Sequence, residues 1–150
     1  MAVFESSITL KCSAEKAFDF LARPENISRL TPPDSALQFV DAPEVLSAGL
    51  SIRAKASVYG MTYDLAHDIQ EFDKPSRITE VQTKGPLPKW TRETSIANNG
   101  DETITITEHI EFSPPGGLAG FVMTEAKIRA SLIDSYAYRD QKLRELLEST

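Results

Sequence analysis

The chain has 150 residues, of which 41% are hydrophobic and 25% charged, an ordinary composition for a globular protein that buries a core. We expect one domain over residues 1–150. The net charge of −6, without a basic run, argues against a nucleic-acid partner. A single cysteine, Cys12, excludes an intrachain disulfide and a thiolate metal cluster. With no signal-peptide pattern and no apolar stretch of about 18 residues, we expect a cytoplasmic protein without a membrane-spanning segment.

The first thirty residues predict a strand followed by two short helices. Apolar and polar residues alternate over Val3–Cys12, as in a strand with one buried face. Ser13 stands where a helix N-cap belongs, so a helix should begin at Ala14. Pro24 ends this helix, and Glu25–Leu30 should form one or two further helical turns.

The middle of the chain predicts a ladder of antiparallel strands. A short edge strand is expected at Leu37–Val40, and clean alternation begins near Ile52. A tight Tyr59-Gly60 turn would fix the next hairpin, because glycine suits the positive φ that such a turn needs. The expected partners across it are Val58 with Met61, Ala56 with Tyr63, Ala54 with Leu65, and Ile52 with His67.

The last hairpin is expected to have a longer connection. A strict two-residue turn at Asn99-Gly100 would place apolar residues opposite polar ones on the flanking strands. We therefore expect a longer loop or a bulge that sets Ile96 against Ile104.

The C-terminal segment predicts a single long helix. No glycine or proline occurs from Phe121 to Thr150, a span of 30 residues. The expected buried stripe consists of Phe121, Val122, Ile128, Leu132, Tyr136, Leu143 and Leu147. A long helix lying across an antiparallel sheet tends to leave a space that can hold a ligand.

A row of polar residues falls on the apolar face of the predicted sheet. The inferred registers place four of them opposite one another on successive strands: His67, Glu80, Arg92 and Glu108. Further candidates lie one step away: Tyr63, Gln82, Trp90 and Thr94. Charged side chains there are costly unless they are paired or hydrated. Three interpretations remain: a paired network that sets strand register, a polar patch that orients an apolar ligand, and a catalytic acid/base pair.

Metal and cofactor sites are not indicated. His109 falls on the opposite face from His67, so the two cannot share a metal ion. The segment Gly116–Gly120 lacks the spacing of a phosphate-binding loop, and Cys12 has no evident base partner. We expect neither a metal nor a cofactor.

Several segments resemble small bacterial proteins of the START-like superfamily, also called polyketide cyclase/dehydrase or SRPBCC. They are Ser13–Pro33, Gly85-Pro86 with Trp90 after it, Thr107–Phe112, and Tyr136–Arg139. The resemblance covers essentially the whole chain. It implies an α+β helix-grip fold, in which a curved antiparallel sheet of about seven strands wraps around a long C-terminal helix, with two short helices after the first strand. Members of this superfamily include lipid-transfer domains, hormone receptors and cyclases, so the fold alone does not assign a function.

The chain departs from this subgroup at two positions. The subgroup often has histidines on the strand after the Gly-Pro turn, where this chain has Arg92 and Thr94. A metal or acid/base role of those histidines therefore does not transfer.

Together these features predict binding of a small, mainly hydrophobic ligand, such as a lipid, a polyketide or an isoprenoid-like molecule, between the sheet and the last helix. The predicted ligand-binding residues are Tyr63, His67, Glu80, Gln82, Trp90, Arg92, Thr94, Glu108 and Tyr136. One alternative is a cyclase/dehydrase-type enzyme that uses Glu80 or Glu108 as a general acid or base. Another is a protein-interaction module with a vestigial cavity.

Overall fold

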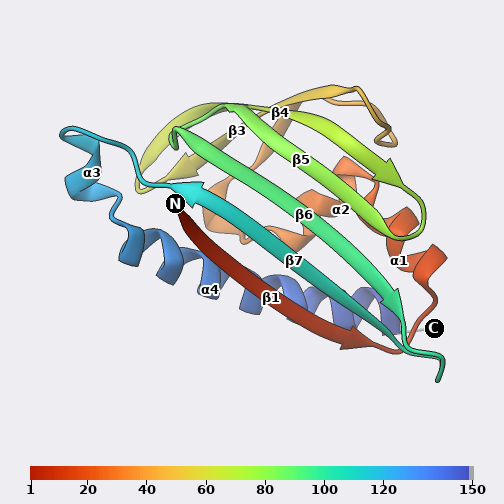
Figure 1. Cartoon of the computed structure of the whole chain (residues 1–150). Coiled ribbons are helices and arrows are strands. Elements are labelled where there is room, and N and C mark those ends of the chain that lie inside the picture. The colour runs from red at the N-terminus through yellow and green to blue at the C-terminus, as the bar shows by residue number, and fades with distance from the viewer. Residues whose placement is uncertain (149–150) are drawn as a thin grey trace.

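A computed structural model describes residues 1–148 as one seven-stranded antiparallel sheet with a long helix across one face (Figure 1). The strand order is β1-β7-β6-β5-β4-β3-β2. The strands are β1 (Ala2–Leu10), β2 (Gln38–Asp41), β3 (Ser51–Val58), β4 (Met61–Asp73), β5 (Arg77–Lys84), β6 (Lys89–Asn98) and β7 (Ile104–Ser113). The helices are α1 (Ala14–Leu21), α2 (Pro24–Leu30), η1 (Pro33–Ser35), α3 (Ala119–Val122), α4 (Glu125–Leu143) and the π-helical turn η2 (Arg144–Glu148). The predicted α+β helix-grip class is confirmed.

The first helix after β1 begins where the sequence predicts, and the second begins one residue earlier, at Pro24 rather than Glu25. The Ser13 hydroxyl accepts a hydrogen bond from the Lys16 amide at 3.1 Å and so caps α1. Pro24 occupies the first turn of α2, where a missing amide hydrogen has no cost. The short strand β2 lies at the edge of the sheet, as expected.

The β3–β4 hairpin has the predicted register. All four expected pairs are present, from Val58 with Met61 to Ile52 with His67. Tyr59 and Gly60 both have positive φ, 50° and 79°, which matches a two-residue turn that follows the twist of the strands.

Two other registers differ from the prediction. The pairing of β4 with β5, which has irregularities near Ala66 and Ile69, places His67 opposite Gln82 rather than Glu80. On β6, Thr94 rather than Arg92 lies opposite Glu108. The predicted straight row of four residues is therefore wrong, although the Glu80–Arg92 pair within it is correct.

The β6–β7 connection accounts for the second shift. It is longer than a two-residue turn, as predicted, but it sets Ile96 opposite Ile106 and not Ile104. The amide of Asn99 donates to the Thr103 carbonyl at 3.0 Å and closes a loop outside the ladder. Relative to the predicted register, each residue of β6 therefore pairs with a β7 residue two positions further along the chain. A shift of two residues keeps apolar residues on the same face of the sheet.

The predicted single C-terminal helix is broken near its start. Thr124 caps α4 by accepting from the Lys127 amide at 3.2 Å, so α3 is a separate short turn. Phe121 and Val122 are 78% and 54% exposed, and their assignment to the buried stripe was wrong. The remaining stripe residues are buried or half-buried on α4 and η2. Residues 149–150 of the predicted helix lie outside the described residues.

The core consists of two apolar clusters on the inner face of the sheet. One lies under α1 and α2 and includes Phe18, Leu30 and Leu143. The other includes Phe112 and Tyr136 beneath α4. Within residues 1–148, every helix is too short or too polar to cross a membrane.

Candidate ligand-binding cavity

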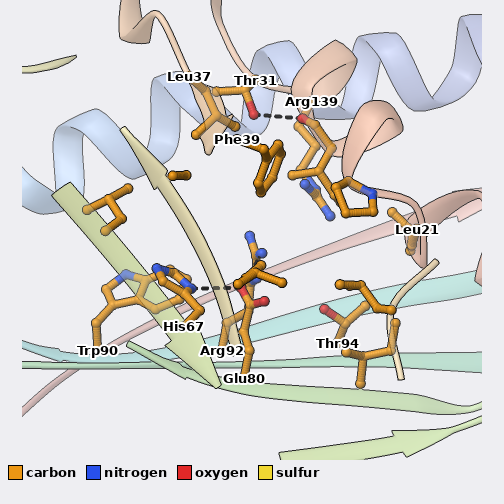
Figure 2. A pocket seen from close by; sticks show the side chains of 17 residues that line it. Leu21, Thr31, Leu37, Phe39, His67, Glu80, Trp90, Arg92, Thr94 and Arg139 are labelled. Atoms are coloured by element: carbon orange, nitrogen blue, oxygen red, sulfur yellow. Dashed lines mark hydrogen bonds and ion pairs between the residues drawn. The ribbon is translucent and has the colours of Figure 1, made fainter. Parts of the chain in front are cut away.

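A cavity of about 160 Å³ lies between the inner face of the sheet and the elements that cover it (Figure 2). Strands β2 to β6 contribute the sheet side of the lining, while α1, α2 and α4 contribute residues from the elements that cover it. The apolar lining consists of Leu21, Pro24, Ile27, Leu37, Phe39, Leu46, Ile52, Ala54, Leu65, Ile78 and Trp90. The polar lining consists of Thr31, His67, Glu80, Arg92, Thr94 and Arg139.

An ion pair between neighbouring strands lies in the sheet wall. Arg92 Nη2 donates a hydrogen bond to Glu80 Oε1, and the two side chains are 18% and 8% exposed. His67 Nδ1 lies 3.6 Å from the same carboxylate oxygen. Burial alone would raise the pKa of the Glu80 carboxyl, but the Arg92 charge and the contact with His67 lower it to about 2. Glu80 is therefore ionised at neutral pH.

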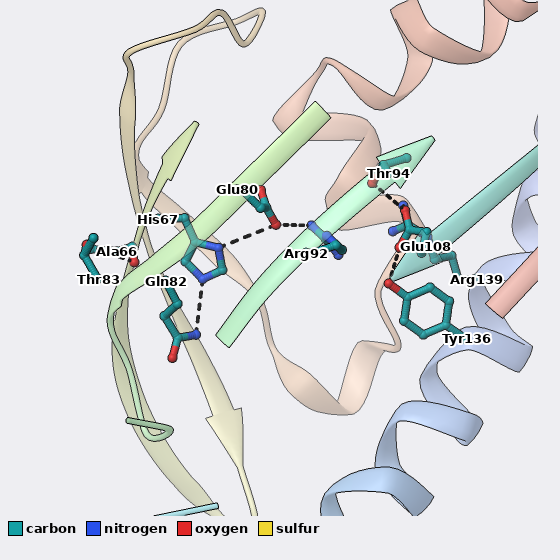
Figure 3. A network of polar contacts seen from close by, with 10 residues as sticks. All are labelled: Ala66, His67, Glu80, Gln82, Thr83, Arg92, Thr94, Glu108, Tyr136 and Arg139. Carbon is teal, nitrogen blue, oxygen red and sulfur yellow. Dashed lines mark hydrogen bonds and ion pairs between the residues drawn. The ribbon is translucent and has the colours of Figure 1, made fainter. Parts of the chain in front are cut away.

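A second carboxylate, Glu108 on β7, accepts three hydrogen bonds (Figure 3). Arg139 Nη2 donates to its Oε1 at 2.8 Å, Thr94 Oγ1 donates at 3.0 Å, and the Tyr136 hydroxyl donates to Oε2. Burial would raise the pKa of Glu108, but Arg139 and then Arg92 lower it. Burial raises the pKa of the Tyr136 hydroxyl, and Glu108 raises it further, so this group stays protonated.

Arg92 donates to Glu80 and interacts electrostatically with Glu108. Burial would lower the pKa of its guanidinium, but Glu80, Tyr136 and Glu108 raise it. Two arginines therefore face two carboxylates in one network, which explains how charged residues persist on an apolar sheet face. Trp90 packs beside this network, with its ring 5.2 Å from that of His67 and 5.3 Å from the Arg92 guanidinium carbon.

Gln82 contacts the outer side of the histidine. Its Nε2 lies 3.3 Å from His67 Nε2. Its Oε1 is buried and has no hydrogen-bond partner among the described residues. An unpartnered buried oxygen is costly, so the Gln82–His67 contact has unused capacity to accept a proton.

The structure brings together five of the nine predicted residues as cavity lining: His67, Glu80, Trp90, Arg92 and Thr94. Glu108 and Tyr136 lie behind this lining and hold Arg139, while Gln82 contacts His67. Tyr63 packs in the cluster around Tyr136, away from the lining.

Arg139 is the charged lining residue that the sequence reasoning missed. It follows Tyr136 by three residues and precedes Leu143 by four, so helical spacing puts it on the buried stripe. A charged residue at a position of the buried stripe is the sequence feature that could have identified Arg139 as a site residue. No group of three potential metal ligands is found among residues 1–148.

Solved structures with the same fold cover nearly the whole chain. A protein from Chromobacterium violaceum matches with a TM-score of 0.75 at 11% identity, covering 99% of both chains. A conserved protein from Geobacillus kaustophilus matches with a TM-score of 0.73 at 15% identity, over 96% of this chain and 93% of that one. The major latex-like protein 151 of Panax ginseng gives 0.71 at 11% identity, over 96% and 95%. At these identities the likeness shows the fold alone.

No protein-family model matches the sequence, and no curated protein matches it. The structural likeness is therefore to proteins whose sequences have diverged widely from this chain.

Proposed function

We propose that this chain is a START-like protein that binds a small, mainly apolar ligand between the sheet and α4. The observation that carries the proposal is a cavity with a mostly apolar lining and a few polar groups held in place by their own network. The sequence resemblance and the helix-grip neighbours support it, because this architecture leaves a space under the long helix.

The cavity volume favours a compact ligand. An engineered apolar cavity of roughly 150 Å³ holds one benzene molecule, and this cavity measures about 160 Å³. A single ring or a short branched isoprenoid unit matches this volume better than a complete lipid chain or a multi-ring polyketide. Phe39, Ala54 and Leu65 lie side by side on β2, β3 and β4 and would form an apolar surface against such a group.

The state of the carboxylates favours binding over catalysis. A general base works best when its pKa lies near the operating pH, whereas the pKa of Glu80 is lowered to about 2 and that of Glu108 is also lowered. Both carboxylates already accept hydrogen bonds from arginine. These contacts orient the polar wall and leave neither carboxylate poised to take a proton, so the cyclase/dehydrase alternative is the weaker one.

The test uses Trp90, the single tryptophan of the chain, which lines the cavity. Native mass spectrometry of protein purified from its source would identify a co-purifying molecule, and extraction would recover it. Titration of the emptied protein with that molecule should change Trp90 fluorescence saturably with one site per chain. If no small molecule co-purifies and single-ring compounds leave the fluorescence unchanged, the binding proposal fails.

A further inference from the structure

The cavity wall carries more positive than negative side chains. Arg92 on β6 and Arg139 on α4 both line it, whereas Glu80 is the one carboxylate in the lining formed by residues 1–148. Glu108 lies outside the lining and is already bound by three donors. A ligand would therefore meet two guanidiniums and a single carboxylate.

Arg139 retains donors that the protein does not use. Its hydrogen bonding within residues 1–148 employs Nη2, whereas a guanidinium has five N–H groups. The side chain is 8% exposed, so bulk water has little access to the others. Figure 2 shows the guanidiniums of Arg92 and Arg139 approaching the same space from the sheet and from the helix. Donors that line a cavity gain from an acceptor placed between them.

We infer that the ligand is a small monocarboxylate, with its carboxylate between Arg92 and Arg139 and its apolar part against the aliphatic lining. This inference rests on the proposed function, because it names the ligand class of the same cavity. The planar guanidinium fork matches a carboxylate in shape and charge. The volume of about 160 Å³ leaves room for one ring or a short branched chain behind the carboxylate.

The charge balance limits the ligand to a single negative charge. Arg92 and Arg139 are each paired with one carboxylate, Glu80 and Glu108. Each further negative charge in this buried site adds to the cost of burial, so an anion with one charge is favoured over an anion with two.

A phosphate dianion fits this network less well than a monocarboxylate. It would bring two negative charges to two guanidiniums that are already paired with Glu80 and Glu108, whereas a monocarboxylate brings one.

Isothermal titration calorimetry of the full chain tests this with pairs that differ in charge and not in shape: benzoate with benzamide, and 3-methylbutanoate with 3-methylbutanamide. At pH 6 the carboxylate of at least one pair should bind tenfold or more tightly than its amide.

The variants separate a ligand contact from a structural role. Arg139→Met combined with Glu108→Gln removes one charge of each sign, so it avoids an unpaired buried carboxylate. It should lower the carboxylate-to-amide affinity ratio at least tenfold, while Arg53→Met, at an exposed ion pair on β3, should leave the ratio unchanged. Amides that bind as tightly as their carboxylates would overturn the inference and leave the proposed function standing. Failure of all four compounds to bind would contradict both.

Discussion

Arg139 on α4 and Glu108 on β7 form an ion pair at 2.8 Å in which the side chains are 8% and 3% exposed. This pair joins the long helix to the sheet at the edge of the cavity. The Tyr136 hydroxyl, one helical turn earlier, donates to the same carboxylate. The position of α4, and with it the width of the cavity, therefore depends on a polar contact within an apolar interface.

Removal of Arg139 should be strongly destabilising. Arg139→Met leaves the Glu108 carboxylate buried without its main compensating charge, so the free energy of unfolding at pH 7 should fall by about 3–5 kcal/mol. Part of the loss should be recovered as the pH is lowered, because Glu108 then takes up a proton. Urea denaturation at several pH values measures both effects.

The matched control is Arg53→Met, at a pair with Asp41 in which the side chains are 64% and 67% exposed. Exposed pairs contribute little, so stability should change by less than about 0.5 kcal/mol. Equal losses in the two variants would mean that the Arg139–Glu108 pair is not buried.

The Glu80 carboxyl should stay ionised far into the acid range. Its pKa is lowered from 4.5 to about 2, so it stabilises the fold above about pH 4.5, by roughly 3 kcal/mol, and this contribution is lost as the pH falls toward 2. Carbon-13 NMR of the side-chain carboxyl gives the midpoint directly. Arg92→Met should raise that midpoint, and a wild-type midpoint at 4 or above would contradict the ion pair.

The sequence predicts elements well where a local signal determines them. The Tyr59-Gly60 turn fixed the β3–β4 register because two residues of positive φ leave one hairpin geometry available. The β4–β5 register had no such local signal, because the ladder starts at Asp73 with Arg77 and irregularities in β4 change the register again before His67. The straight polar row failed at this hairpin and at the β6–β7 loop.

The candidate site was predictable only in part. Glu80 and Arg92 were paired correctly because no irregularity separates them. Arg139 depends on a contact between α4 and β7, and helical spacing alone does not say which strand a helix faces. The break before α4 depends on the Thr124 cap, which competes with continuation of the helix through Phe121.

The Tyr59-Gly60 turn should be sensitive to a side chain at the second position. Gly60 has a φ of 79°, so Gly60→Ala forces an L residue into the left-handed region and should cost about 1 kcal/mol. Gly116→Ala is the control, because Gly116 has ordinary φ and open space around it. Thermal unfolding should show a lower midpoint for the first variant and an unchanged or slightly higher one for the second.

The exposed position of Phe121 can be tested against a buried phenylalanine. Phe121 is 78% exposed on α3, whereas Phe112 on β7 is fully buried. Phe121→Ala should change the free energy of unfolding by less than about 0.5 kcal/mol, and Phe112→Ala should lower it by about 3–5 kcal/mol. A large loss of stability on Phe121→Ala would contradict the exposed position of Phe121 and support the continuous helix that the sequence predicts.

Filling the cavity should abolish ligand binding without unfolding the protein. Ala54 on β3 lines the cavity, so the larger side chain of Ala54→Leu would occupy space that a ligand needs. Filling an apolar void commonly adds about 0.5–2 kcal/mol of stability, so we expect a higher unfolding midpoint together with a loss of binding of at least tenfold.

Ala56→Leu provides the comparison, since Ala56 lies on the same strand and face but in packed surroundings outside the lining. Overpacking there should cost about 1–3 kcal/mol, with binding to the remaining folded protein retained. Titration of Trp90 fluorescence and thermal unfolding measure both variants. If Ala54→Leu destabilises the protein as much as Ala56→Leu and leaves binding intact, the space beside Ala54 is not where the ligand lies.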